Sequence, residues 1–430
     1  MNIEGALAEA GLSNIWEIKS FFEAHPYYLS TRWSDNKLYC LCYTKGKSIL
    51  ANPVVQEANG TVLEQGTNKV VCCGIDVFRE ENSSWVANHF DSLQTDGALN
   101  YQIIPDGSFV KAYWYDGKWM LSTTRTPDAS YSKWEGPTFH SMFMDAVNTK
   151  YPKLFEKMSK DFSYTFILQH TDNRIVKPIK EPELFLISVT SMTGETRFHE
   201  LQELPDLGVP TLETGSLVFP VGADATKESP KEWGDSETDS DMIGAKIAAF
   251  VNALSWIFPG VFFVRYNTQT HRYTRVKVEN EQFRQVLDLR GNRPNFEYRY
   301  LEMINDTKDK TVVSRFLEYY PEKSEEVKKA QENLETTRGE IHDFYCQKYL
   351  SRDPEDRRVL IPKCYLDTIL ALNRQFKKDR QPTTIDTVTE YLATLSIEDQ
   401  AQVYQISDQV HNPVRLGGDK KPERRRWRRR

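Results

Sequence analysis

Alternation of apolar and polar residues dominates the first 129 residues and predicts β-strands in this region. Tight-turn dipeptides of the Asp-Gly type, which favour hairpins, separate some of the alternating stretches. The clearest stretches are Val70–Cys73, Tyr101–Ile104, Phe109–Tyr115 and Lys118–Thr123, with Asp-Gly pairs at Asp106 and Asp116. We therefore expect antiparallel sheet here.

The pattern continues with a mixture of helices and strands up to about residue 291. Residues 138–160 have the spacing of a helix, and residues 221–241 form a polar, acidic insert rich in Ser, Asp, Glu and Gly. The other predicted elements are strands at Tyr164–Gln169 and Leu184–Val189, a helix at Met242–Trp256, and a hairpin of Phe262–Tyr266 with Tyr273–Val278.

Helical periodicity replaces alternation after about Gly291. Two further helices are predicted at residues 364–378 and 384–410. An apolar stripe at near-heptad spacing predicts an amphipathic helix that packs on its own domain, with a partner-binding coiled coil as the alternative. The stripe is Val327, Ala330, Leu334, Ile341, Tyr345 and Tyr349.

Strands followed by helices predict an α+β domain with an all-α domain behind it. We expect the α+β domain to cover residues 1–295 with its insert at 221–241. The helical domain then covers residues 296–412, and a basic tail covers residues 413–430. The chain length of 430 residues is ample for this organisation.

Composition excludes two broad classes of protein. A hydrophobic fraction of 39% is too high for a disordered chain, and the longest apolar stretch, near Phe185–Val189, is too short for a membrane span. The N-terminal residues lack the basic and apolar regions of a signal peptide. We therefore expect an intracellular protein, cytoplasmic or, given the basic tail, nuclear.

Cysteine and histidine positions give no metal-binding pattern, so we predict no metal site from spacing. None of the six cysteines forms a C-x-x-C pair, and ordinary buried thiols are expected. The cysteines are Cys40, Cys42, Cys72, Cys73, Cys346 and Cys364.

The segment from Asp106 to Trp119 carries the strongest motif in the chain. Its Asp-Gly-Ser turn, strand, Gly-containing hairpin and second strand resemble the region around motif I of the T-even phage RNA ligase family, where the turn is K-x-D-G-S. Thr123–Ala129 resembles the stretch that follows in that family. The implied fold is the nucleotidyltransferase domain of ATP-grasp-like RNA and DNA ligases, built on antiparallel sheets.

Other blocks resemble family motifs in the same order over about residues 35–350. The first two resemble the A-R-G strand and the P-F-x-K-F-F-N segment, and the later ones resemble motifs III, IV and V and the start of the helical domain. They are Ala51–Val62, Gly74–Phe78, Thr165–Val176, Pro259–Val264, Arg275–Gly291 and Phe316–Pro321.

The reaction implied by the resemblance begins when a lysine amine attacks the α-phosphate of ATP. The lysyl-AMP then passes AMP to an RNA 5′-phosphate, and an RNA 3′-hydroxyl displaces it. In register with Asp106, the lysine position holds Ile104, which has no lone pair and cannot be a nucleophile. The resemblance therefore implies ATP and Mg²⁺ as cofactors of the family, while covalent AMP is not expected on this chain.

Further reactive positions of the family differ in this chain. The motif III glutamate falls at Gln169 and the motif IV glutamate at Pro259, which has no side-chain acceptor. The second motif V lysine falls at Glu279, which reverses the charge where a phosphate would lie. By resemblance, the remaining candidates for contacting a nucleotide are Asn52, Asp106, Gly107, Ser108, Gln169 and Lys277.

Two alternatives to this placement of the nucleophile are open. A shifted register aligns Gln94–Gly97 with motif I, but that segment also lacks a lysine, and the hairpin after it then fits poorly. The other alternative is that Lys111 or Lys118 reaches the site from the strands after the turn.

Charge is distributed unevenly along the chain. The net charge is −6, while residues 419–430 hold eight basic and two acidic residues, so the rest carries about −12. Arginines neutralise phosphates and a tryptophan stacks on bases, so RNA is the expected partner of the tail, with nuclear targeting or simple solvation as alternatives. The candidate RNA-binding residues are Lys420, Lys421, Arg424, Arg425, Arg426, Trp427, Arg428, Arg429 and Arg430.

Three functions follow from these observations. The first is a catalytically degenerate ligase-like protein that binds RNA or a nucleotide, or acts as a scaffold. The second is a working RNA ligase that uses a non-standard lysine or pre-adenylated RNA. The third is an assembly protein that meets a protein partner through the helical domain and uses the arginine-rich tail.

Overall fold

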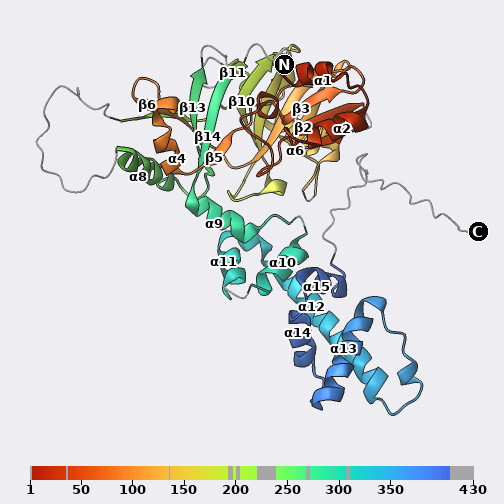
Figure 1. Cartoon of the computed structure of the whole chain (residues 1–430). Coiled ribbons are helices and arrows are strands. Elements are labelled where there is room, and N and C mark those ends of the chain that lie inside the picture. Colours follow the sequence, from red (N-terminus) through yellow and green to blue (C-terminus); the bar gives the residue numbers. More distant parts are fainter. Residues whose placement is uncertain are drawn as a thin grey trace, which may run out of the picture. The chain divides into compact units, whose positions relative to one another are not determined.

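The computed structural model describes residues 2–34, 37–134, 136–191, 197–199, 204–219, 239–267, 272–293, 295–306 and 310–406 (Figure 1). The chain separates into two compact units, with the division after Gln285, inside helix α9 (Glu281–Arg290). The sequence analysis places the boundary after residue 295. The basic tail and residues 221–238 of the predicted insert lie outside the described residues.

The α+β prediction is confirmed. The first unit combines helices with three largely antiparallel sheets, and every described element that lies wholly in the second unit is helical. Alternating side chains explain the strands, because one face of each sheet packs on helices while the other meets a neighbouring sheet.

The first sheet has four antiparallel strands in the order β1-β2-β3-β4. Tyr39, Leu41 and Leu63 on one of its faces pack in a core with helices α1 and α2. The strands are β1 (Ser30–Trp33), β2 (Leu38–Cys42), β3 (Asn59–Glu64) and β4 (Val70–Cys72), and the helices are α1 (Asn2–Ala10), α2 (Ile15–Glu23) and α3 (Pro53–Gln56).

The second sheet has the order β11-β10-β9-β7-β8 and is antiparallel throughout. Val110, Phe166 and Leu186 on one face form a core with helix α6. The strands are β7 (Ser108–Tyr115), β8 (Lys118–Thr123), β9 (Phe162–Gln169), β10 (Glu183–Ser191) and β11 (Arg197–His199); the helices are α6 (Phe139–Lys150) and α7 (Leu154–Lys157).

The prediction of a single helix at residues 138–160 is wrong in one respect. Helix α6 ends at Lys150, and a separate short helix, α7, follows it. Pro152 lies in the interruption and has no N–H to continue the ladder of helical hydrogen bonds.

The third sheet has the order β12-β6-β13-β14-β5, and β5 runs parallel to β14. Leu99, Val261 and Phe263 on one face pack with helices α4 and α8, while Phe262 on the other face packs with Ile167 of the second sheet. The strands are β5 (Arg79–Glu81), β6 (Ala98–Ile104), β12 (Thr214–Val218), β13 (Gly260–Asn267) and β14 (Arg272–Glu279); the helices are α4 (Ser83–Asn88), α5 (Phe90–Leu93) and α8 (Asp239–Asn252).

The helical unit is built around α12 (Ser324–Tyr345), whose apolar stripe is buried from Val327 to Tyr345. This confirms the prediction of a helix packed on its own domain. Over its described part, residues 384–406, the helix predicted at 384–410 is instead two helices, because Ser396 caps a new one; residues 407–410 lie outside the described residues. The other helices of the unit are α10 (Phe296–Ile304), α11 (Val312–Tyr319), α13 (Lys363–Asp379), α14 (Ile385–Ala393) and α15 (Ile397–Val403).

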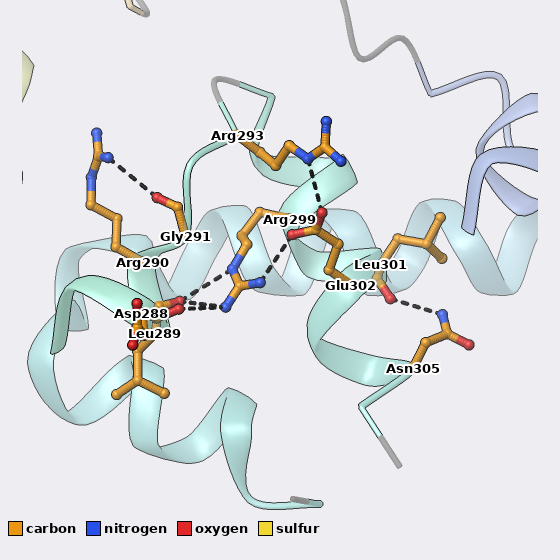
Figure 2. Close-up of polar contacts among 9 residues, drawn as sticks. All are labelled: Asp288, Leu289, Arg290, Gly291, Arg293, Arg299, Leu301, Glu302 and Asn305. Atoms are coloured by element: carbon orange, nitrogen blue, oxygen red, sulfur yellow. Dashed lines mark hydrogen bonds and ion pairs between the residues drawn. The ribbon is translucent and has the colours of Figure 1, made fainter. Parts of the chain in front are cut away.

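Figure 2 shows how Arg299 fastens the end of α9 to α10. Its guanidinium donates hydrogen bonds to the carbonyl oxygens of Asp288 (3.0 Å) and Leu289 (2.9 Å), which lie in the last turn of α9. It also pairs with Glu302 at 3.0 Å. Gly291 permits this approach, because a Cβ there would lie 2.8 Å from Cδ of Arg299.

The length and hydropathy of the helices bear on whether one of them could cross a membrane. In the part of the chain that the structure describes, no helix combines the length and the apolar character that crossing a bilayer requires.

Candidate functional site

A small hollow between the second and third sheets brings together most of the residues that the motifs single out. Its volume is about 160 Å³. Strand register explains the convergence, since Gly260 of β13 lies opposite Ile104 of β6 on one side and Glu279 of β14 on the other. The lining residues are Phe78, Ile104, Pro105, Asp106, Gly107, Phe109, Ile167, Ile175, Pro259, Phe262, Lys277 and Phe283.

Ile104 fills the position at which the resemblance places a nucleophile. Its side chain is 5% exposed and belongs to an apolar cluster with Ile167 and Phe262. Phe78 and Phe109 pack against the same cluster. Pockets for small ligands usually measure about 300–1,000 Å³, so this space, lined largely by aromatic and aliphatic side chains, is smaller than the usual range.

Asp106 braces a neighbouring loop. Its carboxylate is only 3% exposed, and one oxygen accepts hydrogen bonds from the backbone N–H groups of Val176 and Lys177, both at 2.8 Å. Gly107 allows the turn to lie against β9, because its φ is +156° and a Cβ would come within 2.6 Å of the Leu168 carbonyl oxygen. These two residues therefore have a clear structural role.

Gln169 and Ser108 also bind the protein itself. The Gln169 side chain donates to the Asp106 carbonyl oxygen at 2.6 Å and accepts from Lys177 Nζ at 3.3 Å. The Ser108 hydroxyl accepts from Asn173 Nδ2 at 3.0 Å. Neither side chain lines the hollow.

Lys277 is the only ammonium group among the described residues that line this hollow, and it is already paired. Its Nζ lies 3.2 Å from Glu279 Oε1 and 3.8 Å from Glu80 Oε1. Burial alone would raise the pKa of the Glu80 carboxyl, but its hydrogen bond from Lys45 and the charge of Lys277 bring it below its usual value. The charge that would attract a phosphate is thus compensated from within the fold.

Glu80 is the site residue that sequence reasoning missed. It faces Lys277 because β5 pairs with β14 in parallel, with Lys277 opposite Glu80. No local spacing marks this contact, since the two strands are far apart along the chain. The only sequence signal is the position of the glutamate just after the Gly74–Phe78 block.

Asn52 lies elsewhere. Its side chain caps α3 by accepting a hydrogen bond from the Val54 N–H at 2.9 Å, and it does not line the hollow. The candidate RNA-binding residues of the basic tail lie outside the described residues.

Lys111, the proposed substitute nucleophile, points toward the first sheet. Its side chain is 1% exposed, and its Nζ donates hydrogen bonds to the carbonyl oxygens of Asn59 (3.0 Å) and Gly60. It is absent from the lining of the hollow, and Lys118 lies exposed at the start of β8. Neither alternative lysine takes the place of Ile104.

Four of the cysteines are buried and all six are free thiols. Burial raises the pKa of the Cys40 thiol, while the hydrogen bond from Cys40 lowers that of Cys42. Over the described residues, no group of three or more His, Cys, Asp or Glu side chains is arranged to hold a metal ion.

Comparison with known proteins gives similarities without a family assignment. No protein-family model matches the chain. The chain is 25% identical over 294 residues to an immediate-early protein ICP-46 homolog of Invertebrate iridescent virus 6, and 30% identical over 105 residues to an RNA ligase of Rhodothermus phage RM378. These matches cover 64% and 22% of this chain, but only 58% and 24% of the two relatives.

Solved structures similar to this chain include two ligases with low sequence identity. An archaeal ATP-dependent RNA ligase gives a TM-score of 0.42 at 12% identity, covering 85% of this chain and 89% of that one. A putative ATP-dependent DNA ligase from Aquifex aeolicus gives 0.38 at 11% identity, covering 85% and 84%.

Proposed function

We propose that this chain is an RNA ligase-like protein that has lost adenylyl transfer and acts by binding RNA. The relatives support the ligase ancestry, as does the ordered series of motif-like blocks from Ala51 to Pro321. The single observation that carries the loss of catalysis is the buried Ile104 at the nucleophile position. An aliphatic side chain cannot attack a phosphorus atom.

The surroundings of Ile104 support the same conclusion. The amine of Lys277 is held by Glu279 and Glu80, and the amine of Lys111 is held by backbone carbonyls outside the hollow. Pro259 has no side-chain oxygen for a metal ion, and its backbone carbonyl accepts a hydrogen bond from the Asn280 N–H. The residues present therefore do not fit ATP with Mg²⁺.

RNA binding rests on the basic tail. The eight cationic residues of its segment 419–430 can neutralise phosphates, and Trp427 can stack on a base. The rest of the chain is acidic, which makes the tail the strongest candidate for phosphate contact.

The loss of catalysis is tested with ATP labelled at the α-phosphate, in Mg²⁺ or Mn²⁺. We expect no covalent protein–AMP band, beside a positive control ligase that keeps its motif I lysine. A band that one lysine substitution, K277A or K111M, removes would overturn the proposal. Sealing of 5′-adenylated RNA in the absence of ATP would also overturn it, because a working ligase can begin from that intermediate.

RNA binding is tested by titrating labelled single-stranded RNA at several salt concentrations. Deletion of residues 419–430 should weaken binding and flatten its salt dependence, because fewer counterions are released. A variant with lysine in place of each tail arginine keeps the charge and should keep most of the slope. Unchanged affinity and slope after the deletion would exclude the tail as the RNA contact.

A further inference from the structure

A second hollow, of about 250 Å³, lies within the helical unit. We call it the acidic pocket. It is lined by side chains from α10, α12 and α13 and by residues at and after the end of α15. Its chemically distinctive members are Glu297, Tyr300, Glu340, Tyr365 and Tyr404.

The two carboxylates of the acidic pocket are only partly satisfied. Glu340 Oε2 accepts a hydrogen bond from the Tyr365 hydroxyl, and Glu297 Oε1 accepts one from Asn333 Nδ2, both at 2.8 Å. Within the described ranges, neither carboxylate has a cationic partner, and the second oxygen of each accepts no hydrogen bond. An anionic pair in a partly enclosed space favours binding of a cation.

Some other glutamates of α12 have a lysine partner. Glu326 pairs with Lys323 at 2.8 Å, and Glu332 pairs with Lys328 at 3.9 Å. Among the described residues Glu340 has no such lysine, so a cation bound there would come from another part of the chain or from another molecule.

Three tyrosines, each less than a tenth exposed, complete the acidic pocket. The Tyr404 hydroxyl accepts a hydrogen bond from Arg338 Nε at 3.0 Å, but Arg338 itself does not line the pocket. No lysine or arginine is among the described lining residues. Aromatic rings beside carboxylates are the environment in which ammonium and guanidinium groups bind.

We propose that the acidic pocket binds a cationic side chain and that the chain's own basic tail supplies it. A guanidinium is the best match, because its planar set of N–H donors suits carboxylate oxygens. The volume suits one side chain rather than a nucleotide.

Charge and chain connection favour the tail as the source. Its segment 419–430 carries a net charge of +6, opposite in sign to the acidic pocket. Gln405 and Ile406, the last residues that the structure describes, form part of the pocket wall. Lys420 follows Ile406 by fourteen positions, and a chain of that length spans at most about 50 Å. The tail is therefore long enough to return to the pocket.

The inference is tested by titrating a fluorescent peptide with the sequence of residues 419–430 onto the full-length chain. In one variant, glutamine replaces the eight basic residues of the chain's own segment 419–430, which leaves the acidic pocket free. We expect this variant to bind the peptide at least 10-fold more tightly than the unmodified chain, whose tail competes. Equal affinities would overturn the assignment of the tail as occupant.

The acidic pocket is tested in the tail-neutralised background. E297Q/E340Q should weaken peptide binding at least 10-fold, and E340Q alone should weaken it by less. E325Q/E332Q removes the same charge from α12 outside the pocket and should change affinity by less than 2-fold. Equal weakening by both double variants would overturn the site. Circular dichroism confirms that each variant is folded, and no step of the test uses RNA, so it is independent of the proposed function.

Discussion

The two hollows differ in whether their charged groups already have partners. In the hollow between the sheets, Lys277 is paired with Glu279 and Glu80, and the Asp106 carboxylate accepts two backbone hydrogen bonds. In the acidic pocket, Glu297 and Glu340 each have an oxygen without a partner among the described residues. The first has the motifs of a known reaction, whereas the second has none.

This difference shows that a motif and a binding site can lie in separate parts of one molecule. Polar groups that satisfy each other contribute to the fold and offer little to a ligand. Charged groups without a partner in the fold, such as the exposed Glu340, stay available to a ligand of opposite charge. The helical unit is thus the better place to look for recognition, although the sheets carry the resemblance.

The largest effect should come from placing a lysine at residue 104. I104K introduces an ammonium into an apolar cluster with its nearest cation, Lys277, already paired. We expect a loss of about 3–4 kcal/mol in unfolding free energy and no covalent AMP. Chemical denaturation measures the first and α-labelled ATP the second.

I104V is the matched control for that substitution. It removes one methylene from the same position and should cost only about 1 kcal/mol. A folded I104K chain with the stability of the parent and a covalent AMP adduct would show that the hollow still accommodates the reaction.

The next largest effect is expected at Asp106. D106A leaves the N–H groups of Val176 and Lys177 without their acceptor, so we expect a loss of about 2–3 kcal/mol in unfolding free energy. Hydrogen exchange should accelerate at those two amides. D91N, on an exposed aspartate of α5, should change neither quantity. Unchanged exchange at both amides in D106A would exclude the bracing role.

Sequence predicted the fold well where the information is local. Alternation of apolar and polar residues predicted the strands β6 to β10, because the face of the sheet on which a side chain lies depends on its position along the strand. The motif register also brought Ile104, Asp106, Pro259 and Lys277 to one place. Both results depend on short-range pattern.

Contacts between distant segments were not predictable in this way. Glu80 reaches Lys277 through a parallel strand pair, and Asn52 turned out to cap a helix. Glu297, Glu340 and Tyr365 come from three different helices, and no spacing in the sequence indicates that they line one pocket. Groups of residues like these are brought together by the packing of helices, which cannot be read from a single sequence.

A smaller effect is expected when Lys277 loses its two carboxylate partners. E80Q/E279K removes both partners of Lys277 and adds a second cation beside it, so the surroundings of Lys277 should gain affinity for inorganic pyrophosphate. We expect about 1 kcal/mol of stabilisation at pyrophosphate concentrations several times Kd, measured as a rise in Tm. E17Q/E156K carries the same charge change on exposed glutamates of α2 and α7 and should show no rise. Equal stabilisation of the unmodified chain by pyrophosphate would contradict the pairing argument.

The smallest predicted effect concerns alkaline pH. Burial and the hydrogen bond to Glu340 raise the pKa of Tyr365 to about 12, from a usual value of 10.0. The resulting stability is fully present below pH 10 and is lost as the pH rises from 10 to 12, because the unfolded chain releases this proton first. Y365F should therefore lose less stability between pH 9 and 10.5 than the parent, by under about 1 kcal/mol. Parallel stability curves would contradict a raised Tyr365 pKa.

The packing around Ile104 has a consequence for how this chain could change over generations. A return to adenylyl transfer would need a lysine at residue 104, more space among Phe78, Phe109 and Phe262, and the release of Lys277 from its carboxylates. Each change alone weakens the fold or leaves the reaction impossible, so no single mutation restores activity. Under the proposed function, the loss of catalysis is therefore hard to reverse, and later substitutions can only adapt the scaffold to other uses.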